Sequence, residues 1–226
     1  MRKYKTELHC HSSEVSGCSS VNINDVVEKY IEHGYTSLVL TNHLYTFNLF
    51  EEYKAKVDLL FDTCAKAREI AGDRLNVLDG VEFRLDDGND YLLFGVTKEF
   101  LLSDPELSDL EAHELKEKAE KYGIIVIHAH PLRFNQRHLH PSAIHGYEVF
   151  NGHPEQRSNN EAVDLIFAPM AKEGKILTSG TDHHDGHHMP NAGIVTDAPI
   201  TSLDELTATL RSGNYSLIKG DKIVEL

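Results

Sequence analysis

Short apolar runs rich in Val, Ile, Leu and Tyr alternate with segments of helical period along most of the chain. Short runs of this kind, bounded by polar or turn residues, are typical of buried β-strands. The predicted strands span residues 4–8, 37–40, 76–81, 91–96, 124–127, 147–150, 176–178 and 215–218.

The segments between these strands carry signals for the start and end of helices. Asn24 can cap a helix that ends at Gly34. Ser202 and Glu205 form a capping box for a helix that stops at Gly213. Amphipathic patterns predict three more helices, over residues 51–71, 110–122 and 161–173.

The alternation of strand and helix predicts the fold class. It favours a mostly parallel α/β sheet, and the number of repeats predicts that the sheet closes into a TIM-like barrel. No shift in composition divides the chain, so we expect one domain over residues 1–226.

The charge balance narrows the possible partners. The chain has 22 Lys and Arg against 36 Asp and Glu, a formal net charge of -14. This field disfavours long nucleic acid and anionic membranes, whereas a small phosphorylated substrate can bind where metal ions reverse the local charge. Three cysteines, no apolar leader and no long apolar run predict a soluble cytoplasmic protein, whose oligomeric state stays open.

Fifteen histidines are many for a domain of this size, and several directly follow predicted strands. His9 and His11 follow the first strand, and side chains at i and i+2 of an extended segment point to the same side, where both can reach one ion. Glu82 follows another strand, where a carboxylate can bridge two cations. The alternatives are histidines satisfied in the core or at the surface, and a glutamate that caps a helix or forms a salt bridge.

Two later strands end in similar patterns. His128 and His130 follow the strand at 124–127, and Pro131 favours an extended conformation at His130. Arg133 is either a phosphate clamp over the site or a partner in a surface salt bridge.

Asp182 and His184 stand at i and i+2 after the strand at 176–178. Nearby residues are ligands, pocket wall or exposed side chains: His183, His187 and His188, with Asn151 or His153 after the strand at 147–150.

The candidate ligands share one position in the predicted fold. Each lies at the carboxyl end of a strand, where barrel enzymes keep their active sites. Mixed imidazole and carboxylate donors suit zinc, manganese or iron. The set is His9, His11, His43, Glu82, His130, Asp182 and His184.

The motifs ELHCHSS, SLVLTNH, GVEF, HAHP and GTDHH resemble the polymerase and histidinol phosphatase (PHP) family of metal-dependent phosphoesterases. They follow the family's order of D-L-H-x-H, T-D-H, G-x-E, a His-Pro and a late D-x-H. The resemblance implies a distorted (β/α)7 barrel with two or three divalent metal ions that activate water. The implied ligands are His9, His11, Glu82 and Asp182 for the first metal, Glu82 and His130 for the second, and His43 and His184 for the third.

Two departures from the family pattern concern supporting positions. Glu7 replaces the Asp before the first histidine, and Asn42 replaces the Asp of T-D-H. Neither position must bind metal, so we expect both to support ligands instead.

Two further departures concern ligands. A histidine that often binds the second metal has no match in GNDYLLFG, where Asp90 is the nearest donor. The third-metal ligand that usually follows H-x-H falls at Ser16 or Gly17. We therefore expect Glu14 to close the third site, with Cys18 or no residue as the alternatives.

We expect a metal-dependent phosphoesterase that acts on a small phosphorylated substrate. His184 or His183 would protonate the leaving alkoxide, and Arg133 would bind the phosphate. The alternatives are a nuclease or nucleotidase acting on short oligonucleotides or nucleotides, and a non-catalytic metal-binding PHP domain. The complete core ligand set favours catalysis, because a degenerate domain would lose such residues.

Overall fold

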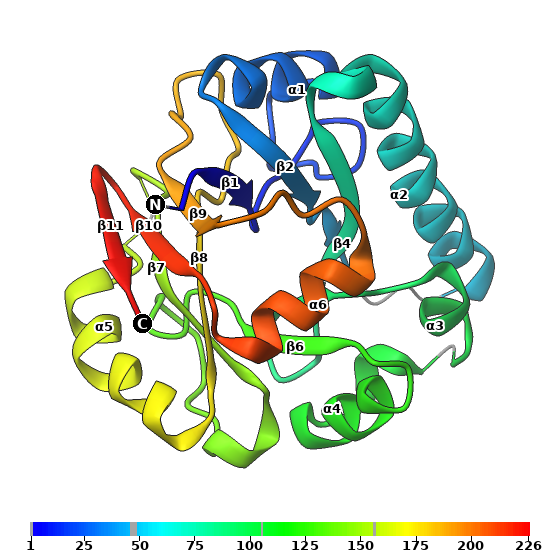
Figure 1. Cartoon of the computed structure of the whole chain (residues 1–226). Helices are drawn as coiled ribbons and strands as arrows, with labels where there is room; N and C mark the ends of the chain where they lie inside the picture. The colour runs from blue at the N-terminus through cyan, green and yellow to red at the C-terminus, as the bar shows by residue number, and fades with distance from the viewer. Residues whose placement is uncertain (1, 46–48, 105, 156) are drawn as a thin grey trace.

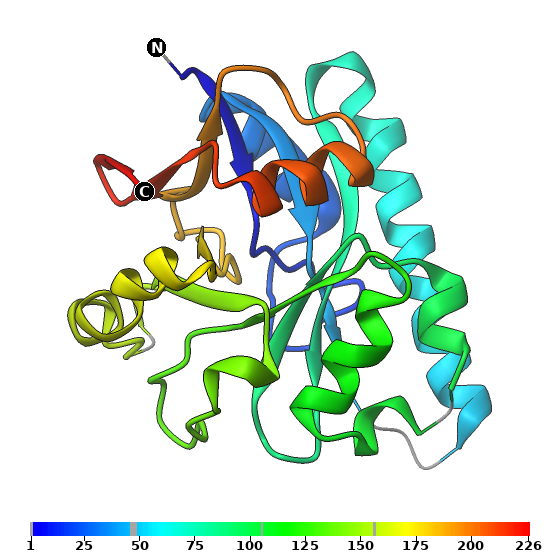
Figure 2. The same ribbon diagram turned by 60° about the horizontal axis from the view of Figure 1, so that its bottom comes forward.

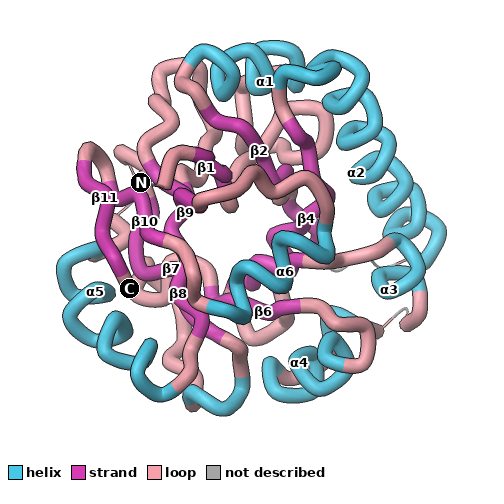
Figure 3. Tube along the Cα trace, in the orientation of Figure 1, coloured by secondary structure: helices cyan, strands magenta, loops and turns pink. Residues whose placement is uncertain are grey.

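The structure is a computed structural model that describes residues 2–45, 49–104, 106–155 and 157–226. Its strands form a ring around the centre of the molecule, and helices α1 to α5 lie outside that ring (Figures 1 and 3). The predicted TIM-like α/β barrel is therefore confirmed, in a distorted form.

The described strands include a counterpart of each predicted one. Strands β3, β9 and β11 are additional: β3 has only two residues, β9 is buried, and β11 is an exposed edge strand. The strands are β1 (Tyr4–Glu7), β2 (Tyr35–Leu40), β3 (His43–Leu44), β4 (Asn76–Arg84), β5 (Asp90–Phe94), β6 (Ile125–His128), β7 (Gly146–Asn151), β8 (Ile176–Gly180), β9 (Ala192–Thr196), β10 (Ser216–Lys219) and β11 (Lys222–Glu225).

The helices agree with the predicted ones, with local corrections. Asn22 rather than Asn24 caps the first helix, because its side chain accepts a hydrogen bond from the backbone of Asp25. Pro169 falls where the predicted helix over 161–173 changes to a 3-10 helix, Ala168–Glu173. The α-helices are α1 (Ile23–Glu32), α2 (Phe50–Ala71), α3 (Lys98–Leu102), α4 (Ala112–Glu120), α5 (Asn160–Phe167) and α6 (Leu203–Ser212).

The sheet is mixed, so the expectation of a mostly parallel sheet is wrong. The strand order is β11-β10-β9-β1-β2-β4-β5-β6-β7-β8, with β3 beside β4. Strands β1, β2 and β4 run parallel, as do β6, β7 and β8, whereas β5 is antiparallel to both of its neighbours. Strand β5 follows β4 after a short turn without a crossover helix, and such a connection forces antiparallel pairing.

Side chains join the two sides of the ring where β8 meets β9 and β10. The Ser179 hydroxyl donates to the backbone oxygen of Ile218 and accepts from the backbone of Gly193, and the Tyr215 hydroxyl donates to Leu177. Because no backbone ladder between β8 and β9 is present in the described residues, the barrel is distorted at this point.

Helix α6 and the segment before it cover the end of the barrel where β2 and β6 begin. The Ser37 hydroxyl donates to the backbone oxygen of Ile200, and Arg211 donates to that of Gly123. The loops that follow the parallel strands lie at the opposite end of the barrel. Figure 2 shows the molecule from another side. No helix among the described residues combines the length and apolar character needed to cross a membrane.

Candidate metal centre

Backbone hydrogen bonds bring together the loops that follow β1 and β8. The Asp182 amide donates to the His9 carbonyl at 2.8 Å, and the His11 amide donates to the His183 carbonyl at 3.1 Å. The motif H-x-H is thereby held beside D-x-H, although the two lie more than 170 residues apart. Gly180 permits this approach, because a Cβ there would lie 2.3 Å from the Cβ of His9.

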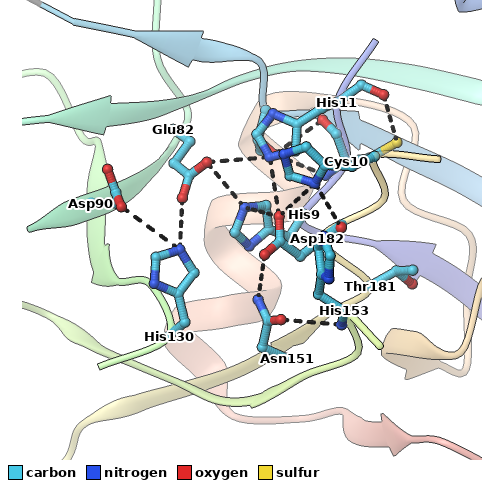
Figure 4. A network of polar contacts seen from close by, with 12 residues as sticks. His9, Cys10, His11, Glu82, Asp90, His130, Asn151, His153, Thr181 and Asp182 are labelled. Carbon is cyan, nitrogen blue, oxygen red and sulfur yellow. Dashed lines mark hydrogen bonds and ion pairs between the residues drawn. The ribbon is translucent and has the colours of Figure 1, made fainter. Parts of the chain in front are cut away.

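Four buried donors converge at the carboxyl end of the strands (Figure 4). The Nε2 atoms of His9 and His11 each lie 3.2 to 3.3 Å from both Glu82 Oε2 and Asp182 Oδ1. These atoms lie within 4.8 Å of one another. The structure thus brings together the four residues expected around the first metal.

The same four atoms lack hydrogen-bond partners among the described residues: His9 Nε2, His11 Nε2, Glu82 Oε2 and Asp182 Oδ1. Buried polar atoms are nearly always paired, because losing water without a replacement costs about 1 to 3 kcal/mol each. Two imidazole nitrogens and two carboxylate oxygens directed at one point are a fitting donor set for zinc, manganese or iron.

Electrostatics keep both carboxylates ready to bind cations. Burial opposes ionisation of Glu82, but the imidazoles of His43 and His9 hold its pKa well below the ordinary value. Burial likewise opposes ionisation of Asp182, but His9 keeps the pKa of this group well below its usual range. Both groups are therefore carboxylates at neutral pH.

Glu82 faces two groups of donors at once. Parallel pairing of β3 with β4 sets His43 opposite Glu82, and His43 Nδ1 lies 3.0 Å from Oε2. The other oxygen, Oε1, lies 2.9 Å from His130 Nε2. Asp90 Oδ2 is 3.9 Å from the same His130 atom, but Arg84 binds both Asp90 oxygens at 2.7 Å. This geometry suits a carboxylate that bridges two metal ions. The position of the second ion, beside His130, has fewer free donors than that of the first, because Arg84 occupies Asp90.

Glu148 is a functional side chain that the sequence analysis did not predict. This buried β7 residue lies with Oε1 2.8 Å from His9 Nδ1, and its Oε2 accepts hydrogen bonds from the backbone of His130 and the side chain of Asn151. A lone acidic residue in the apolar strand YEVF is the signal that could have indicated it, because a buried charge needs partners.

Two candidate ligands have left-handed backbone conformations. The φ angles are +31° at His130 and +55° at Asp182. The expectation that Pro131 keeps His130 extended is therefore wrong, and the hydrogen bond from the His130 amide to Glu148 holds the observed conformation. Such strain in non-glycine residues is concentrated at functional sites.

Arg133 contacts a candidate ligand. Its Nη2 donates to Asp182 Oδ2 at 2.6 Å and to Asn151 and Ser158 at 3.1 and 3.2 Å. These bonds occupy one Asp182 oxygen and leave Oδ1 directed at the histidines. Arg133 therefore forms a salt bridge, as in the alternative interpretation, but this salt bridge is mostly buried and its partner is a candidate metal ligand.

Glu7 and Asn42 support the loops, as expected. The buried Glu7 carboxylate accepts hydrogen bonds from the backbone amides of His9 and Thr181 and from the hydroxyl of Tyr30. Burial raises its pKa to about 7. Asn42 Oδ1 accepts from the Ser12 amide at 2.8 Å.

The expectation that Glu14 closes a third site is wrong. Both of its carboxylate oxygens accept from the amide of Ile23, at the start of α1. Cys18 lies in the expected place instead, with Sγ 3.1 Å from His184 Nε2. Burial would raise the pKa of this thiol, but His184 and His43 lower it to about 6.

The expectation that His183 donates a proton is also wrong. Its ring is fully buried, near Tyr30, and burial lowers its pKa to about 3. His128 does not join the donors either, because its ring stacks near Tyr91 and its Nε2 faces Gln136.

A cavity of about 520 Å³ opens over the centre. Candidate ligands line it together with both nearby arginines, Arg84 and Arg133. His153 and His188 are on its wall, whereas His187 is exposed. This volume suits a small molecule.

The PHP domain family model matches residues 7–188, which is most of the chain. The protein therefore belongs to the PHP domain family, and it carries buried clusters of His, Glu and Asp that are able to hold metal ions. No curated protein matches the sequence significantly.

Solved structures share the fold at low sequence identity. PsfC from Pseudomonas syringae gives a TM-score of 0.72 at 13% identity, over 98% of this chain and 93% of that one. A two-domain protein from Bacteroides vulgatus, described as containing a predicted PHP-like metal-dependent phosphoesterase, gives 0.65 at 16% identity, over 97% of this chain and 66% of that one. The lesion-specific endonuclease PfuEndoQ from Pyrococcus furiosus gives 0.63 at 14% identity, over 92% and 56%. Such similarity establishes the fold alone.

Proposed function

We propose that the protein is a metal-dependent phosphoesterase that hydrolyses a small phosphorylated substrate. The observation that carries this proposal is the group of buried, unpartnered donor atoms from His9, His11, Glu82 and Asp182 below an open cavity. Membership of the PHP family supports the same chemistry.

Different residues would bind the two metal ions that such a reaction uses. His9, His11, Glu82 and Asp182 would hold one ion, and Glu82 with His130 would hold a second. Divalent ions bound there lower the pKa of a water molecule and offset charge on the phosphoryl oxygens.

Arg133 keeps Asp182 in place through Nη2, and its buried Nε has no hydrogen-bond partner among the described residues. Because Arg133 lies on the cavity wall, its guanidinium group is placed to bind a substrate phosphate. His184 lies on the same wall, but its ring nitrogens face Asp182 and Cys18. This arrangement favours metal binding over proton donation by His184.

The test compares metal-free protein with protein reloaded with manganese, zinc or iron(II) on a panel of phosphomonoesters, phosphodiesters and dinucleotides. We expect turnover only with metal, and its loss on chelation. Full turnover without metal would refute the proposal, and tight metal binding without turnover on any substrate would favour the non-catalytic alternative.

A nucleotidase is the second candidate, because one aromatic side chain is exposed at the cavity. Phe134 is 86% exposed and lines the cavity wall. An aromatic ring in this position can stack on a nucleobase. Under this proposal Phe134→Ala raises KM for nucleoside monophosphates but not for phosphates without a ring, and an equal change for both would exclude it. The net charge of -14 argues against long nucleic acid as substrate.

A further inference from the structure

The loop after H-x-H is tied to the loop after Asp182. The Ser20 amide donates to the His184 carbonyl at 2.9 Å, and the Ser19 hydroxyl donates to the same oxygen at 3.2 Å. The Ser20 hydroxyl also donates to Asp185 Oδ2 at 2.8 Å. These bonds hold Cys18, the residue that precedes Ser19, beside His184.

The Cys18 thiol faces the imidazole rings of His184 and His43. Sγ lies 3.1 Å from His184 Nε2 and also interacts with the His43 ring. The His184 ring is fixed from its other side, where Nδ1 lies 2.9 Å from the Asp182 carbonyl oxygen. In a tetrahedral zinc site, bonds of about 2.3 Å to sulfur and about 2.0 Å to nitrogen place these two atoms roughly 3.5 Å apart. The observed separation is close to this value.

A second observation points to a cation at the same place. His43 Nδ1 is buried and has no hydrogen-bond partner among the described residues, although it lies 3.0 Å from Glu82 Oε2. Donor atoms of His11, His43 and His184 lie within 4.8 Å of one another. Three imidazoles therefore gather near the cavity wall, and the Cys18 thiol contacts one of them, His184, at 3.1 Å.

Other donors of the loop are committed elsewhere. Glu14 binds the start of α1, and the Ser16 hydroxyl donates to Asn42 Oδ1 and accepts from the His43 amide. Cys18 is therefore the side chain of this loop that is placed to bind an ion with His43 and His184.

We propose that Cys18, His43 and His184 form a third metal site with two imidazoles and one thiolate. All three line the cavity, so a further ligand can come from water or substrate. A thiolate donor favours zinc over manganese at this position. The inference rests on the metal-dependent function proposed above, and it assigns His184 to metal binding.

Cobalt provides the probe, because Co(II) bound by thiolate has an intense charge-transfer band in the near ultraviolet. Titration of the metal-free protein with Co(II) should produce this band in the native chain. Cys18→Ser should lose the band and about one equivalent of tightly bound metal. Cys64→Ala is the matched control and should keep both, because Cys64 is buried on the inner face of α2 and does not line the cavity.

Two further measurements separate a ligand from a structural role. Cys18→His should restore the lost equivalent without the band, because imidazole replaces the thiolate. X-ray absorption of the zinc-loaded native protein should reveal a sulfur neighbour at about 2.3 Å. Cys18 is exposed, so the thermal midpoint of the metal-free Cys18→Ser protein should equal that of the native chain.

The proposal is overturned if native protein binds Co(II) without the band, if the band survives in Cys18→Ser, or if that variant binds as much metal with native affinity. None of these readouts uses turnover. A protein that shows the band but hydrolyses no phosphoester would refute the proposed function and leave the Cys18 site standing.

Discussion

Glu148 Oε1 lies 2.8 Å from Nδ1 of His9, inside the barrel and away from solvent. When a cation replaces the proton on Nε2, a carboxylate at this distance keeps the remaining proton on Nδ1, so that Nε2 offers its lone pair to the cation. That Nε2 atom is the one directed at Glu82 and Asp182. Glu148 therefore determines which nitrogen of His9 is offered to a cation.

Replacing Glu148 by Gln should lower the metal affinity of the first site by about 10- to 100-fold, the usual effect of losing such an orienting partner. The amide keeps the shape of the side chain but loses the charge. Competition with a chromophoric chelator measures the affinity. Glu69→Gln, on the exposed face of α2, is the control that should stay native. Native affinity in Glu148→Gln would mean that His9 is oriented by other contacts.

The local sequence predicts the candidate metal ligands better than it predicts the residue that orients His9. His9, His11 and Asp182 were predictable because short motifs directly after strands encode them. Glu148 was not, because its partner lies 139 residues away and only the closed barrel brings the pair together. Glu14 was predicted wrongly on its charge, because the backbone amide at the start of α1 competes for the same carboxylate.

The strands of the barrel were also predictable, because the local sequence encodes them too. Apolar runs mark buried strands such as β2 and β6, whatever their direction. Strand direction depends on the connection, and the short turn between β4 and β5 replaces the helix that a parallel pair would need. Strand β11 is exposed along its whole length, so no hydrophobic pattern could indicate it.

Glu82→Gln should reduce turnover by more than any single histidine replacement, and by more than the 10- to 100-fold typical of supporting residues. The reason is that its two oxygens face separate histidines, His43 on one side and His130 on the other. Metal content measured beside turnover tests this, with His130→Ala for comparison. A Glu82→Gln protein that keeps two ions and a near-native rate would show that Glu82 does not bridge.

Arg133→Ala should weaken both metal binding and catalysis, because Arg133 holds Asp182 Oδ2. Loss of a charged hydrogen bond of about 1.5 to 3 kcal/mol corresponds to roughly a 10- to 150-fold fall in kcat/KM. Arg133→Lys keeps the charge without the planar fork and should recover only part of the loss. If kcat/KM falls while metal affinity stays native, Arg133 binds substrate phosphate alone and does not position Asp182.

Glu7 should make the stability of the metal-free protein depend on pH. Burial raises its pKa from 4.5 to about 7 in the folded state. Below pH 4.5 the group is protonated in both the folded and the unfolded chain, so its stabilising contribution is fully present. As pH rises from 4.5 to 7, the unfolded chain releases the proton while the folded chain still holds it, and the contribution is lost once pH has passed through the folded pKa. The free energy of unfolding should therefore fall by roughly 3 kcal/mol over this window, at about 1.4 kcal/mol per pH unit.

Comparison with Glu7→Gln isolates this contribution from those of the other buried groups. Gln cannot titrate, and its amide nitrogen cannot accept the hydrogen bonds that Thr181 and Tyr30 donate, so the variant should be less stable throughout. The difference in unfolding free energy between native and variant protein, measured with urea from pH 4.5 to pH 8, should shrink as pH rises. A difference that is constant across this range would mean that Glu7 is already ionised at pH 4.5 in the folded protein. In that case the hydrogen bonds from Thr181 and Tyr30 would outweigh the cost of burial.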